Sequence, residues 1–239
     1  MIILLWQALD NLRIWPEYLF PSPLKVLESL VEGFGNRTFP IAIGISLKRI
    51  LMGYGVSILL GCFLGILINK FRIINDTIGS LILGLQTLPS ICWLPLSLLW
   101  FGLNEKAIIF VAIMGAIFSI TIAADSSIKN IPPLYLKVGR NMGARKFSLL
   151  FRVIMPAALP YFIPGLKQGW SFAWRSLMAG ELLFVNLGLG YLLMVGRELN
   201  DMSQVIAVML VIATISIAID KLFFGRIEAG IRKRWGLKA

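Results

Sequence analysis

The chain has 239 residues, of which 58% are hydrophobic and only 15% charged, with no histidine and a formal net charge of +11 at pH 7. Soluble domains average about a quarter charged residues, so the composition excludes a soluble globular protein and predicts an all-α integral membrane protein without a metal site. At about 20 apolar residues per crossing, the length allows about five to six transmembrane helices and leaves no room for a catalytic domain.

The N-terminal part of the chain begins with an apolar stretch that is too short to cross a membrane. Charged residues soon follow it, so residues 1–20 are expected to form a short or truncated first helix. Ser22 and Pro23 favour a new helix start. Because hydrophobic side chains recur there at helical spacing, residues 21–45 are predicted to form a periplasmic interfacial helix and a lead-in to the membrane core, residues 46–239.

The clearest single crossing runs from Ile50 to Ile68, where no charged residue interrupts the hydrophobic sequence. Small residues repeat at every fourth position in this segment: Gly53, Ser57, Gly61 and Gly65. Such a face favours close packing against a neighbouring helix, and a substrate path beside it is the alternative. Lys48 and Arg49 are expected to anchor the end of this helix rather than to contact substrate.

A second hydrophobic region, residues 78–101, is interrupted by Pro89 and Pro95. Since proline removes a backbone donor and bends a helix, this region is either one kinked span or two short helices. Gln86 adds a polar side chain at membrane depth, where freed backbone groups must be satisfied by protein or face water. The break is therefore either a pore-lining element or a structural kink.

The remaining crossings are expected at residues 107–124, 156–184 and 205–219. Most Lys and Arg residues lie in the connection 125–156 and in the tail after Asp220. The positive-inside rule puts both segments in the cytoplasm, which predicts a multi-pass protein with a cytoplasmic C-terminus. The excess positive charge therefore reflects topology, and no nucleic-acid partner is expected.

The connection 125–156 is predicted to contain two short helices. The first covers residues 134–142 and ends at Gly143, which is placed as a helix-ending residue. The second covers residues 145–154 until Pro156 stops it. Apolar side chains form a stripe along the second helix: Phe147, Leu150, Phe151 and Ile154. An amphipathic hairpin at the membrane face is a docking surface.

Ionisable residues inside spans are functional candidates. Arg175 lies near Trp170, Trp174 and Glu181 in the sequence, and a cation at that depth can attract an anionic substrate. The alternative is that Arg175 pairs with Glu181 or a neighbouring helix, or extends to the interface. Together with Gln86, these residues form the candidate substrate path.

At this point the sequence resembles a known family. Residues 137–145, with Pro156 after them, are similar to the Glu-Ala-Ala loop of bacterial ABC importer permeases, in which a central glycine separates two coupling helices. Five further motifs resemble the branch that imports nitrate, taurine and alkanesulfonates: Pro21-Ser22-Pro23, Leu94-Pro95 with Trp100-Phe101-Gly102, Pro156-Ala157-Ala158-Leu159-Pro160, Ala179-Gly180-Glu181 and Gly188-Leu189-Gly190-Tyr191. Lys137-Val138-Gly139 replaces Glu-Ala-Ala itself, so no salt bridge from that glutamate is expected.

The resemblance implies a MetI-like permease fold with a cytoplasmic coupling-helix hairpin. It assigns coupling to the ATPase to nine residues: Lys137, Gly139, Arg140, Gly143, Ala144, Arg145, Phe147, Phe151 and Pro156. It also implies a homodimer in the bacterial cytoplasmic (inner) membrane, two cytoplasmic ATPase subunits, and a periplasmic or lipid-anchored solute-binding protein.

Enzymatic activity is not expected of this chain. It has no Gly-x-x-x-x-Gly-Lys-Ser/Thr loop to hold ATP phosphates, so ATP and Mg should bind a separate ATPase subunit, and no cofactor is expected here. The solute is expected to be a small anion such as a sulfonate, taurine or nitrate. The alternatives are a neutral or cationic vitamin precursor, such as a pyrimidine or riboflavin, or a secondary transporter, whose inverted repeat is not evident.

Overall fold

The structure of the chain is a computed structural model, and it describes residues 2–12, 16, 18–183 and 187–235. Every regular element within these residues is helical. The α-helices are, in chain order, α1 (Ile2–Asn11), α2 (Pro23–Gly35), α3 (Thr38–Lys70), α4 (Arg72–Ile74), α5 (Ser80–Gln86), α6 (Leu94–Phe101), α7 (Glu105–Lys129), α8 (Pro133–Asn141), α9 (Lys146–Leu149), α10 (Met155–Leu183), α11 (Leu189–Glu198), α12 (Met202–Ala218) and α13 (Gly225–Arg234). Consecutive helices are joined by the π-helical turns Asn75–Gly79, Leu150–Ile154 and Ile219–Phe224 and by the 3-10 turn Ser90–Trp93. Met1, Phe184 and residues 236–239, which fall in predicted segments, lie outside the described residues.

Among the described residues, four helical segments are long and apolar enough to cross a membrane: Thr38–Lys70, Glu105–Lys129, Lys146–Leu183 and Met202–Arg234. A fifth span results if the halves Arg72–Gln86 and Ser90–Phe101, which meet at 106°, are counted as one. The predicted all-helical membrane fold is thereby confirmed, with four or five candidate spans among the described residues where five to six are expected. The break between the two halves falls at Pro89, as the sequence indicates.

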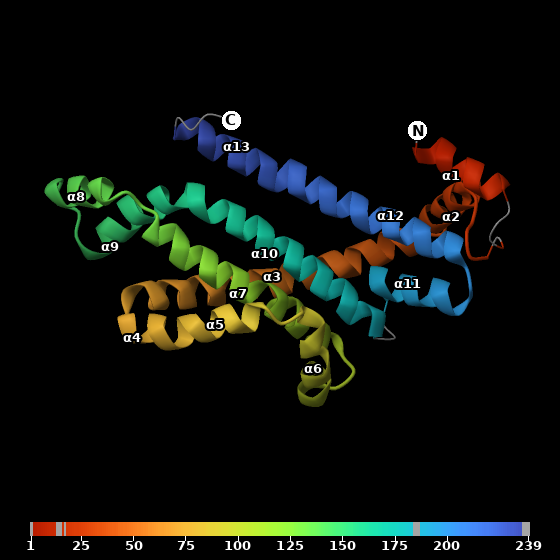
Figure 1. Cartoon of the computed structure of the whole chain (residues 1–239), viewed down its shortest axis with the longest axis horizontal. Helices are drawn as coiled ribbons and strands as arrows, with labels where there is room; N and C mark the ends of the chain where they lie inside the picture. The colour runs from red at the N-terminus through yellow and green to blue at the C-terminus, as the bar shows by residue number, and fades with distance from the viewer. Residues whose placement is uncertain (1, 13–15, 17, 184–186, 236–239) are drawn as a thin grey trace.

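Three helices form the middle of the molecule. α3, α7 and α10 run through it, and their side chains make up most of the buried core (Figure 1). α12 and α13 continue one another along one side, and α8 and α9 project at one end. α11, α1 and α2 lie at the opposite end, while α6 turns away from the bundle after the break.

The small residues of α3 pack directly against α7. A Cβ added at Gly61 would lie 2.8 Å from the Ile120 side chain, and one at Gly65 would lie 2.5 Å from the Ala124 Cβ. Ser57 adds a hydrogen bond from its hydroxyl to the Ile113 carbonyl oxygen, at 3.2 Å. The packing interpretation of this stripe is therefore confirmed, because α7 covers the face that the alternative would need for a substrate path.

Two predictions about helix ends are wrong. Lys48 and Arg49 do not mark the end of a helix, because α3 begins at Thr38 and continues through both of them. Pro156 does not stop the second hairpin helix, because α9, the following π-helical turn and α10 form one continuous segment, Lys146–Leu183. The π-helical turn interrupts the regular hydrogen-bond ladder just before Pro156, which lets a residue without an N–H remain in the helix.

Candidate functional site

A cavity of about 330 Å³ lies where the bent span is broken. The break itself contributes residues 86–91, α7 contributes Met114, Gly115 and Phe118, and α10 contributes Phe172 and Arg175. The approach of α7 to α10 is close here, since a Cβ on Gly115 would overlap the Ser176 side chain. The structure thus brings two of the predicted path residues, Gln86 and Arg175, to one cavity.

Arg175 is the charged group of this cavity. Its side chain is exposed, its Nε donates to the Ser171 carbonyl oxygen at 3.2 Å, and its guanidinium lies 4.9 Å from the centre of the Phe172 ring. Within the described residues no carboxylate forms an ion pair with Arg175. A guanidinium in this position is available to an anion that enters the cavity.

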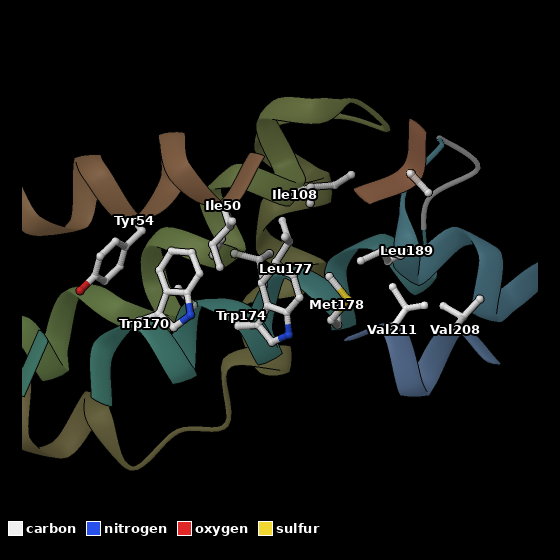
Figure 2. Packing of buried hydrophobic residues seen from close by; sticks show 14 of the residues in the cluster. Ile50, Tyr54, Ile108, Trp170, Trp174, Leu177, Met178, Leu189, Val208 and Val211 are labelled. Atoms are coloured by element: carbon white, nitrogen blue, oxygen red, sulfur yellow. The ribbon is translucent and has the colours of Figure 1, made fainter. Parts of the chain in front are cut away.

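Trp170 and Trp174 lie on a different face of α10 from Arg175. Both are nearly fully buried, with their rings stacked at 6.2 Å, and the Tyr54 ring meets Trp170 edge-on at 5.2 Å. Figure 2 shows them among the buried side chains of the core. Their indole N–H groups have no hydrogen-bond partner among the described residues. The two tryptophans therefore lie in the core and not on the cavity beside Arg175.

Glu181 is bound by a different cation from the one that the sequence suggested. Its carboxylate accepts a hydrogen bond of 2.9 Å from Arg49 Nη1, and Ser46 Oγ lies 2.8 and 2.9 Å from its two oxygens. Glu181 and Arg49 are both almost completely buried. The alternative in which Arg175 pairs with Glu181 is therefore wrong, since the Arg49 side chain already occupies that carboxylate.

Sequence reasoning missed Ser46 and Arg49 as partners of Glu181. Arg49 was assigned to a helix end because the uncharged run starts directly after it, although α3 extends in both directions. The signal that could have found the pair is charge matching, because a buried cation in one span requires a carboxylate from another.

The predicted helix hairpin is present at the end of α7. Gly143 follows α8 with a φ of +83°, its N–H donates to the Arg140 carbonyl oxygen, and the Ala144 N–H donates to the Gly139 carbonyl oxygen, both at 3.0 Å. These two bonds form a Schellman helix end, in which glycine occupies the left-handed position without steric cost. A Cβ on Gly139 would lie 2.8 Å from the Val153 side chain, so α8 packs closely on the helix that follows it.

The hairpin presents apolar and cationic side chains together. Phe147 and Phe151 are 75% and 60% exposed, and Lys137, Arg140 and Arg145 are also exposed. Large exposed aromatic rings on an amphipathic helix are typical of a surface that a partner covers.

The chain is similar to known membrane transport proteins. The family model described as "binding-protein-dependent transport system inner membrane component" matches residues 57–232. A Methanocaldococcus jannaschii protein assigned as an ABC transporter permease is 37% identical over 226 residues, covering 92% of this chain and 84% of that protein. The nitrate import permease protein NrtB of Synechocystis sp. is 27% identical, and the taurine transport system permease protein TauC of Escherichia coli is 26% identical, each covering 92% of this chain and 82% of the relative.

A solved structure shares the fold. The MetNI methionine ABC transporter in an inward-facing conformation superposes with a TM-score of 0.71 at 16% identity, covering 81% of this chain and 96% of that chain. The predicted MetI-like fold is confirmed by this likeness.

Proposed function

Because the chain belongs to the family of binding-protein-dependent transport system inner membrane components, it is a permease subunit of an ABC importer, and we propose that its solute is a small anion such as nitrate, taurine or another sulfonate. Family membership makes it a multi-pass inner membrane protein whose partners are a separate ATPase and a solute-binding protein. ATP is hydrolysed on that ATPase and not on this chain.

The proposal of an anionic solute rests on the position of Arg175. Arg175 lies in the last third of α10, eight residues before Leu183, and its side chain is exposed. A charged side chain within a membrane span usually faces a water-filled cavity or the bundle interior, or pairs with another group. Arg175 faces a cavity with Gln86 and Ser90, beside a broken helix. The lining is largely apolar, but among the described residues it carries one cation and no carboxylate, so the cavity suits the passage of an anion better than that of a cation.

We further propose that the α8–α9 hairpin and the C-terminal helix face the cytoplasm. In this proposal the chain forms a homodimer, and the hairpin of each copy is moved by one of two ATPase subunits. The cations of the hairpin support this orientation, and its exposed aromatic rings support a protein partner. The proposed coupling residues are those of the hairpin: Lys137, Gly139, Arg140, Gly143, Ala144, Arg145, Phe147, Phe151 and Pro156.

The test is uptake by the complete importer in proteoliposomes, with nitrate and taurine as probes. Arg175→Gln should lower uptake of the transported anion at least about tenfold, a loss of about 1.4 kcal/mol, while the ATPase still copurifies. Arg175→Lys should retain part of the uptake because it keeps the charge. Lys48→Gln, which removes an exposed cation from α3, is the matched control and should behave like the wild type.

Two results would contradict the anion proposal. Undiminished uptake by Arg175→Gln would remove Arg175 from the path. Uptake of a pyrimidine or riboflavin by the wild type, without uptake of either anion, would favour the vitamin-precursor alternative.

A further inference from the structure

A buried network of polar side chains joins α3 to the C-terminal part of α10. The helices α11 and α2 lie at the end of the molecule opposite the α8–α9 hairpin (Figure 1). The centre of the network is Glu181 near the end of α10, which contacts Arg49 and Ser46 of α3 at 2.8–2.9 Å. All three residues are at most 2% exposed. Neither the anion path nor the hairpin uses this network, so its function is a separate question.

The network binds the backbone that leads into α11. Arg49 Nη1 donates to the Leu187 carbonyl oxygen at 2.8 Å, the Leu189 N–H donates to Ser46 Oγ at 2.9 Å, and the Gly190 N–H donates to Glu181 Oε2 at 2.9 Å. Three polar groups of residues 187–190 are therefore held by α3 and α10. We call residues 187–190, which include the first two residues of α11, the connection.

Two glycines let the connection approach the carboxylate. A Cβ on Gly188 would lie 2.7 Å from the carboxylate atoms of Glu181, and one on Gly190 would lie 2.5 Å from the Glu181 Cβ. Any larger residue would displace either the backbone or the carboxylate. The sequence motifs Ala179-Gly180-Glu181 and Gly188-Leu189-Gly190 are thus the two sides of a single contact.

Arg49 extends the network to a third helix. Its Nη2 donates to Glu105 Oε1 at 3.0 Å, and Glu105 is the first residue of α7, with its side chain 53% exposed. One guanidinium therefore joins α3 to α7, to α10 and to the connection. A lysine ammonium cannot reproduce these contacts, because it lacks the planar fork that presents donors in two directions.

The position of Glu181 on α10 suggests what the network does. α10 continues the segment that starts in the hairpin at Lys146 and reaches Glu181 close to its other end. The connection then leads into α11, which packs against α12. The network is therefore a polar link between α10 and the two helices that follow it in the chain. A second link is the ion pair of 3.0 Å between Lys167 of α10 and Asp220, just after α12.

We propose that Arg49 and Glu181 are positioning residues for transport: they fix the connection to α3, so that α11 and α12 move together with α10 when the hairpin is displaced. This inference rests on the proposed function, in which the ATPase moves the hairpin. Neither residue contacts solute. Their loss leaves ATP hydrolysis possible but separates it from the movement of α11 and α12.

The first experiment measures whether the connection is held. Leu189 is fully buried, so Leu189→Cys reports opening of the connection through its labelling by a water-soluble maleimide, after both native cysteines, Cys62 and Cys92, are replaced by serine. Adding Glu181→Gln or Arg49→Lys should raise the labelling rate at least about tenfold, because labelling follows local opening. Adding Lys48→Gln, next to Arg49 on α3 but exposed, should leave it unchanged.

The second experiment measures coupling in the complete importer with its ATPase and binding protein, with nitrate and taurine as probes. Arg49→Lys and Glu181→Gln should keep basal ATP hydrolysis within about twofold while the stimulation by the binding protein falls at least about fivefold, as expected when an allosteric coupling is lost. Uptake should fall with the stimulation. Lys48→Gln should retain both.

Several results would overturn the proposal. One is a Glu181→Gln variant whose connection is opened but whose ATP hydrolysis is still stimulated normally by the binding protein. Another is a labelling rate of Leu189→Cys that does not rise in either Glu181→Gln or Arg49→Lys. If Glu181→Gln or Arg49→Lys does not assemble, Ser46→Ala is the milder variant, since it removes only a hydroxyl. If Ser46→Ala also fails to assemble, or if it shows wild-type labelling and wild-type stimulation, the network has a role in folding alone. Failure of the proposed function is distinguishable, because it would appear in the wild type as absence of anion uptake, whereas the labelling experiment needs no solute.

Discussion

Gly143 ends α8 with a φ of +83°, and a Cβ added to it would meet no heavy atom within 4 Å. Space therefore allows any residue there, and the backbone conformation alone restricts the choice. The left-handed conformation costs an ordinary L-residue about 1–2 kcal/mol, and only asparagine and aspartate share some of the freedom of glycine. A substitution at Gly143 therefore changes the backbone conformation of the turn without creating a steric clash of its Cβ.

Substitution of Gly143 tests the role of this turn. Gly143→Val should shift the angle between α8 and α9 and reduce both copurification of the ATPase and solute uptake, because valine is strained at positive φ. Gly143→Asn is the matched control and should retain most of both, since asparagine tolerates this conformation. Copurification with a tagged ATPase and uptake in proteoliposomes are the measurements. Wild-type behaviour of Gly143→Val would show that the hairpin does not couple to the ATPase.

The two arginines of the spans show that burial decides what a charge can do. Arg49 is 2% exposed and has its guanidinium divided between two carboxylates and a backbone carbonyl. Arg175 is exposed on a cavity, and its contacts among the described residues are a backbone carbonyl and an aromatic ring. Removing one partner of a buried pair typically costs about 3–5 kcal/mol, so Arg49 contributes to structure, while Arg175 remains available to a ligand.

At the scale of helices, α3 and α7 depend on small residues at regular spacing. Gly61 meets the β-branched side chain of Ile120 and also lies near the Ile117 carbonyl oxygen. Neither group can move away without separating the two helices. Gly55 lies on the same helix, and a Cβ there would meet nothing within 4 Å.

Alanine substitutions at Gly61 and Gly55 are expected to have different effects on stability. Gly61→Ala should lower the free energy of unfolding by about 1–3 kcal/mol, the usual cost of overpacking a core. Gly55→Ala should be neutral or stabilising by up to about 1 kcal/mol, because alanine has the higher helix propensity. Thermal unfolding of the purified chain in detergent gives both values. Equal midpoints for the two variants would contradict the close packing of α3 on α7.

Local patterns predicted the elements well where the chain itself determines them. The uncharged spans, the break at Pro89 and the helix end at Gly143 each follow from composition or from backbone chemistry over a few residues. The helix through Pro156 was not predictable in this way, because a π-helical turn and tertiary packing compensate for the missing N–H. The start of α3 was not predictable either, since the partners of Arg49 come from α7, α10 and residue 187, far away in the sequence.

Long-range pairing was the part of the site that sequence reasoning could not supply. Arg49 and Glu181 are separated by 132 positions, and no periodicity relates one to the other. The nearest cation in the sequence, Arg175, lies on a different face of α10 from Glu181. Candidate path residues that are close in sequence therefore lie on different faces of α10. Arg175 faces the cavity, and both tryptophans lie in the core.

Two exposed turns, on either side of α7, can report the orientation of the chain in the membrane. Met142 lies at the hairpin turn and Leu103 lies between α6 and α7, and they are 82% and 77% exposed. α7 spans the distance between these two turns. If the cations of the hairpin face the cytoplasm, the two positions must lie on opposite sides of the membrane.

Single cysteines at these positions test the orientation in a chain whose native cysteines are replaced by serine. Leu103→Cys should react with a membrane-impermeant maleimide added to intact spheroplasts, and Met142→Cys should react only after the membrane is opened. Because both side chains are largely exposed, a difference in labelling reports the side of the membrane and not burial. The reverse pattern would invert the assignment and put the hairpin out of reach of a cytoplasmic ATPase, while labelling of both from outside would contradict α7 as a span.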